Sequence, residues 1–132
     1  MPATMNPGAA KGRNASGPIT KHRFVKVDTA ATDGETVMQC DTAGELAYGA
    51  SMFSVSASEI TKGKGASVII EGRAILEASE ALAVGDKVST AADGRAAVAA
   101  AGDNVLGVID EPAAGAGDQC SVHLWAAGAV LA

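Results

Sequence analysis

The stretch Gly65-Ala-Ser-Val-Ile-Ile-Glu-Gly-Arg-Ala-Ile-Leu-Glu77 indicates the fold class of this chain. A glycine opens it three residues before a valine, and β-branched residues then form a run with the character of a strand. Glycine adopts positive φ without a Cβ clash, so the opening glycine marks a turn that feeds the strand. Gly72 divides the run, which predicts either one bent strand or two strands separated by a bulge.

The same turn signal, a glycine followed three residues later by Val or Cys, occurs at four other places in the 132 residues. These are Gly34–Val37, Gly85–Val88, Gly102–Val105 and Gly117–Cys120. The intervals between the five signals are unequal, which argues against a fixed structural repeat. Short strands at close spacing predict a mainly all-β fold, a small β-barrel or sandwich of short antiparallel strands.

Alternating apolar residues and turn residues place the other expected strands. They are Arg23–Val27, Thr36–Cys40, one strand within Leu46–Val55, Lys87–Thr90, Arg95–Val98, Val105–Asp110 and Cys120–Trp125. A short helix is expected near Ala78–Ala83, where Ala, Glu and Leu favour it. Residues 1–20 differ from the rest, because Pro and Gly interrupt them and apolar periodicity is absent. We therefore expect a flexible N-terminal arm over residues 1–20 and a single β-rich domain over residues 21–132.

Charge separates the beginning of the chain from the remainder. Through Val27 there are five basic and no acidic residues, whereas five basic and fifteen acidic residues follow, a net charge of −10. A basic arm on an acidic body predicts docking on an acidic partner or on a neighbouring copy, and a solubilising tail is the alternative. Nucleic-acid binding is not expected, since five cations make few phosphate contacts and the acidic remainder of the chain repels phosphate. The candidate docking residues are Lys11, Arg13, Lys21 and Arg23.

No arrangement of residues predicts catalysis or a metal site. Cys40, Cys120, His22 and His123 are the conceivable zinc ligands. Cys120 and His123 lie three apart in an expected strand and so point to opposite faces, and the paired short spacings of zinc modules are absent. We expect no enzyme, no metal and no cofactor. The two cysteines are expected to be free and buried, and no membrane span or signal peptide is predicted.

Trp125 is the candidate for a contact between subunits. In the strand Cys120–Trp125, Val122 and Leu124 share one face, while Ser121, His123 and Trp125 share the other. If the first face is buried, His123 and Trp125 point outward, and tryptophan is enriched at protein interfaces. The alternative is that the N-terminal segment of the same chain covers Trp125.

From about Ile19 to Leu124 the chain resembles the cement, or head decoration, proteins of tailed phages. The likeness lies in an N-terminal Gly/Pro-bearing arm followed in order by several short motifs, and in a composition rich in Ala, Gly and Ser and poor in aromatics. The motifs are Tyr48–Ser51, Val68–Ala74, Leu82–Val88, Val105–Val108 and Gly117–Leu124.

This resemblance implies a small β-barrel-like domain that forms homotrimers on the outer surface of the virion. Such proteins bind expanded heads and clamp neighbouring major capsid proteins, often through an arm that orders on the capsid by strand addition. The chain would be made in the host cytoplasm, with no nucleic-acid or membrane partner. We expect that removing residues 1–20 abolishes capsid binding and leaves the fold intact. A carbohydrate- or partner-binding β module without catalysis is the alternative function.

Overall fold

A computed structural model describes residues 6–130, with side chains described from residue 12 to residue 125. This part of the chain is nearly all β, as predicted. Its strands are β1 (Asn6–Ala15), β2 (Phe24–Val27), β3 (Thr36–Gln39), β4 (Gly49–Ser51), β5 (Ala66–Glu77), β6 (Lys87–Thr90), β7 (Ala96–Val98), β8 (Asn104–Glu111) and β9 (Gln119–Val130). Two short helices accompany them, the 3-10 helix η1 (Thr29–Ala31) and α1 (Ala57–Thr61).

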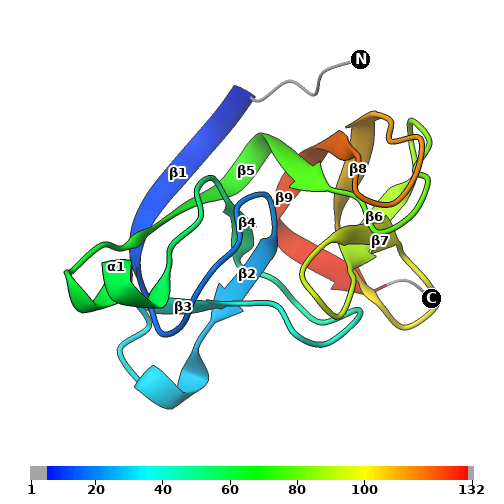
Figure 1. Cartoon of the computed structure of the whole chain (residues 1–132). Helices are drawn as coiled ribbons and strands as arrows, with labels where there is room; N and C mark the ends of the chain where they lie inside the picture. Colours follow the sequence, from blue (N-terminus) through cyan, green and yellow to red (C-terminus); the bar gives the residue numbers. More distant parts are fainter. Residues whose placement is uncertain (1–5, 131–132) are drawn as a thin grey trace.

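Five strands close into a barrel, and four more extend from it. Around the barrel the order is β1-β3-β2-β4-β5, and β5 pairs back with β1 (Figure 1). From β5 the sheet continues through β9, β8 and β6 to β7. The pairings are antiparallel except the short one between β1 and β3. The predicted barrel therefore carries a sheet extension that the sequence does not reveal.

The long strand β5 joins these two parts. Its first half pairs with β1 and β4, and from Gly72 onward it pairs with β9, beginning opposite Leu124. Gly72 has a φ of 89°, a conformation that favours glycine, so the strand bends there without breaking. Of the two possibilities left open by the sequence, a single bent strand is correct.

Two apolar clusters fill the fold because neighbouring residues of β5 point to opposite sides. Val68 belongs to a small cluster with residues of β1, β2 and β3, whereas Ile69 belongs to a larger one that includes Phe24 and residues of β8 and β9. Cys40 and Cys120 are buried in the larger cluster as free thiols, which confirms the prediction for them.

The N-terminal segment departs most from the sequence expectation. The prediction that residues 1–20 contain no regular element is wrong for Asn6–Ala15, which form β1. Residues 1–5 lie outside the described part of the chain. Strand pairing uses backbone groups and so accepts a segment poor in large side chains. Irregularities between Pro7 and Ala9 accommodate the proline.

Removing residues 1–20 is therefore no longer expected to leave the fold intact. It would take away the strand that closes the barrel. It would also remove Ile19, which is only 2% exposed and pairs with Val55.

The expected helix near Ala78–Ala83 is also wrong. Ala78 and Leu82 are buried and form isolated bridges to Ala96 and Ala113, so tertiary contacts override the helical propensity of this segment. The α-helix lies at Ala57–Thr61 instead, where Ser56 and Glu59 form a capping box.

The buried thiols predict a loss of stability in alkali. Burial raises the pKa of Cys40 and of Cys120 to about 12, whereas an exposed thiol titrates near about 8.5. The unfolded chain therefore releases these protons first, and the free energy of unfolding should fall between about pH 9 and pH 12, by at most about 1.4 kcal/mol per pH unit and thiol. Urea titrations across this range test the effect. A Cys40→Ala/Cys120→Ala variant should show a shallower decline, and an equally steep one would contradict the assignment.

Candidate interaction surface

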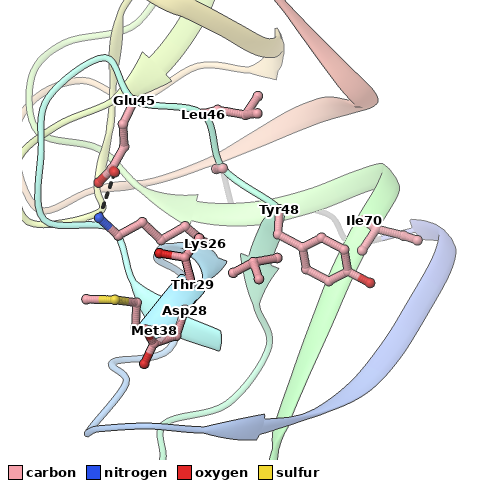
Figure 2. Close-up of a pocket in the computed structure, with 10 residues that line it drawn as sticks. Lys26, Asp28, Thr29, Met38, Glu45, Leu46, Tyr48 and Ile70 are labelled. Atoms are coloured by element: carbon pink, nitrogen blue, oxygen red, sulfur yellow. Dashed lines mark hydrogen bonds and ion pairs between the residues drawn. The ribbon is translucent and has the colours of Figure 1, made fainter. Parts of the chain in front are cut away.

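A groove of about 720 Å³ lies between the β2–β3 hairpin and the loop that precedes β4 (Figure 2). Tyr48 and Ile70 lie together on one side of it, while Lys26 and Glu45 lie on another and are joined by an ion pair. Val27, Met38, Leu46 and Ala47 add further apolar lining. The groove is thus mainly apolar, with its charges gathered at one place.

At this place one cation is paired with two carboxylates. Lys26 Nζ lies 2.7 Å from a carboxylate oxygen of both Asp41 and Glu45, and these hydrogen bonds raise its pKa. The second oxygen of Glu45 accepts hydrogen bonds from the backbone N–H groups of Asp41 and Thr42. The network fixes the loop that carries Leu46, whose side chain remains 57% exposed. An apolar residue held outward on a fixed loop is suited to contact a partner.

Trp125 extends this apolar face. It lines a small cavity together with Tyr48 and Ile70, which also line the groove, so the two features are continuous. We refer to Leu46, Tyr48, Ile70 and Trp125 as the Trp125 surface. Trp125 is 40% exposed, which leaves part of the indole ring available.

The alternation predicted for the C-terminal strand holds at four of its five side chains. Val122 and Leu124 are buried, and His123 and Trp125 point outward. Ser121 is buried instead, and its hydroxyl donates to Glu111 Oε1. The outward positions are consistent with a contact role for His123 and Trp125, and that role remains a prediction.

Two of the four candidate docking cations are engaged within the domain. The guanidinium of Arg13 donates from Nε to the Tyr48 hydroxyl at 3.1 Å and lies 5.1 Å from the centre of the ring. Arg23 pairs with Glu77 at 3.3 Å and donates to the carbonyl of Asp93. Lys21 is exposed, and the side chain of Lys11 lies outside the described part. Arg13 and Arg23 therefore have structural roles that the sequence does not show.

The residues considered for zinc do not form a cluster in the described part of the chain, where no group of three or more His, Cys, Asp or Glu is placed to hold a metal. His22 contacts the side-chain amide of Gln119 at 3.4 Å, and burial lowers its pKa. Among the described helices, none has the length and apolar character needed to cross a membrane.

The sequence missed Leu46 and Ile70 as surface residues. Leu46 falls in a segment where a strand was expected, and Ile70 falls in an apolar run that predicts burial throughout. Leu46 is exposed on the loop that the Lys26 network fixes, whereas Ile70 is partly buried, packs against the smaller apolar cluster and lines the groove.

Together, the closed barrel and its sheet extension define a small all-β protein with exposed apolar side chains at Leu46 and Trp125. A family model described as phage cement protein matches residues 11–124. The chain therefore belongs to the phage cement protein family, as the resemblance implied, and this membership gives it a structural role in the phage head.

A solved structure has the same fold. It is the head fiber gp8.5 N base of bacteriophage phi29, which is 15% identical, with a TM-score of 0.67 over 92% of this chain and 97% of that one. Among curated proteins, none matches the chain significantly.

Proposed function

We propose that this protein decorates the outer surface of the expanded phage head and stabilises it by clamping neighbouring major capsid proteins. The observation that carries the proposal is the match of residues 11–124 to the phage cement protein family. Leu46 and Trp125, which are 57% and 40% exposed, support the homotrimer that this proposal includes, because they offer an apolar contact area. The function is binding without catalysis.

The proposal assigns different surfaces to different contacts. His123 and Trp125 lie at the interface of a homotrimer, and Leu46 extends that interface. Lys11 and Lys21 provide positive charge for docking on the capsid, with Arg13 and Arg23 contributing through the fold they stabilise. Many copies on one shell would make the reinforcement large even if each contact is modest.

Cosedimentation with undecorated heads of the phage tests this function. The purified protein is mixed with heads before and after expansion, and bound protein is measured at increasing concentration. Saturable binding to expanded heads alone is the expected result. Absence of binding to both forms would refute decoration.

Replacing the exposed indole should weaken association between subunits. We expect Trp125→Ala to cost about 2 kcal/mol of association free energy, roughly a thirtyfold change, because buried tryptophans dominate interface energies. Sedimentation equilibrium measures it. Phe53→Ala is the matched control, since Phe53 is 56% exposed and lies outside the Trp125 surface. If both variants had the same association free energy as the parent protein, Trp125 would not lie at the interface.

A further inference from the structure

The strand β1 is paired through its backbone along its described length. It forms seven registered pairs with β5, from Asn6 opposite Arg73 to Arg13 opposite Ala66, and two with β3. Of its described side chains only Ala15 is buried. The one described long-range side-chain bond of the strand joins Arg13 to Tyr48. Any strand of the same backbone geometry could therefore occupy this place.

A short segment, Ser16–Pro18, separates β1 from the next residue that is anchored in the core. Ile19 is buried and exchanges two backbone hydrogen bonds with Val55, at 2.9 and 2.8 Å. Between Ala15 and Ile19 lie Ser16, Gly17 and Pro18. No atom lies within 4 Å of the position that a Cβ on Gly17 would take, so this residue has room to rotate. The strand can turn away here while Ile19 stays in the core.

The place that β1 occupies is shaped for a closely approaching backbone. A Cβ on Gly65 would lie 2.6 Å from the carbonyl oxygen of Arg13, so the glycine is needed for β1 to reach β5. If β1 left, the edge of β5 from Ala66 to Arg73 would carry unpaired backbone groups beside the buried Val68.

We propose that β1 exchanges between copies of this protein, so that β1 of one copy closes the barrel of its neighbour on the outer edge of β5. A second copy is the fitting occupant because its β1 reproduces every pair that the first copy loses, which makes the exchange energetically inexpensive. Charge is compatible with this occupant, since β1 carries two basic residues, Lys11 and Arg13, and no acidic residue, whereas residues 28–132 carry a net charge of −10. The exchange goes beyond capsid binding and requires no capsid.

Disulfide trapping between two singly substituted proteins tests the exchange. Gly12 pairs with Ser67 in the register, and no atom lies within 4 Å of the position that a Cβ on Gly12 would take. Gly12→Cys protein is mixed with Ser67→Cys protein at high concentration, oxidised and separated under denaturing, non-reducing conditions. A covalent heterodimer is expected, because the two thiols meet only if β1 of one chain lies on β5 of the other.

Two matched proteins complete the test. The double variant Gly12→Cys/Ser67→Cys can form the disulfide within one chain. Formation of this bond shows that the substituted chain folds and that the register is correct. Glu77→Cys mixed with Gln119→Cys is the control, since these paired residues join β5 to β9, which does not exchange. The proposal would be overturned if the double variant formed its disulfide only within one chain and the mixed single variants gave no covalent heterodimer.

A variant that needs no introduced cysteine gives an independent result. Deleting Gly17 shortens the segment Ser16–Pro18 and hinders β1 from folding back onto its own barrel. The exchanged oligomers should then form a larger share of the protein in sedimentation velocity. An unchanged share would contradict exchange through this segment.

Discussion

A chain that lacks residues 1–14 is expected to lose most of its stability. The deletion removes the seven registered pairs between β1 and β5 and opens the barrel beside the buried Val68. If each of the seven pairs contributes about one backbone hydrogen bond at about 0.5–1.5 kcal/mol net, the free energy of unfolding should fall by roughly 4–10 kcal/mol. That is comparable with the whole stability of a small domain, about 5–15 kcal/mol. Urea denaturation followed by far-UV circular dichroism measures the loss.

Deleting only residues 1–5 is the matched control, because every described pair of β1 begins at or after Asn6. This shorter deletion should change the denaturation midpoint little. If the chain lacking residues 1–14 unfolded at the same urea concentration as this control, β1 would be an independent arm, as the sequence suggests, and the closed barrel would not be needed for stability.

Phe24→Ala is the point substitution with the largest expected effect. Phe24 is fully buried in the larger apolar cluster, and the chain has only four aromatic residues. Its backbone also links β2 to the Gly94 turn and to Cys40. Replacing a buried phenylalanine by alanine costs about 3–5 kcal/mol, because the surrounding structure does not fill the cavity. Thermal or urea unfolding of the purified variant measures this cost.

The second phenylalanine of the chain provides the control. Phe53 is 56% exposed, so Phe53→Ala should change the free energy of unfolding by less than about 0.5 kcal/mol. Equal losses in the two variants would mean that Phe24 does not hold the core together.

Much of the strand content follows from local signals in the sequence. Lys87–Thr90 matches β6 at both ends, and the strands expected at Arg23–Val27 and Thr36–Cys40 match β2 and β3 to within one residue. In these segments the turn residues and the alternation of apolar side chains both favour a strand. Local preference and tertiary structure therefore agree there.

The errors arise where tertiary contacts decide the outcome. The segment Asn6–Ala15 has weak strand propensity and becomes a strand because the edges of β3 and β5 are available to it. The Trp125 surface is missed in part for a related reason, since Leu46 and Ile70 come from different segments and line one groove only in the folded chain. The docking roles of Arg13 and Arg23 stay predictions, and their charge alone does not show the Tyr48 and Glu77 side chains that they contact within the domain.

The pairing of Asn6 with Arg73 also sets an order of events during synthesis. The first strand to leave the ribosome cannot find its main partner until the chain has grown past residue 73, so the barrel closes only after more than half of the protein has been made. Until then β1 has only its short pairing with β3 available in its own chain, and when several ribosomes translate one messenger RNA, neighbouring nascent chains lie close enough to exchange β1 before either barrel has closed. Under the proposed exchange, subunits would associate during their synthesis, before they bind a phage head.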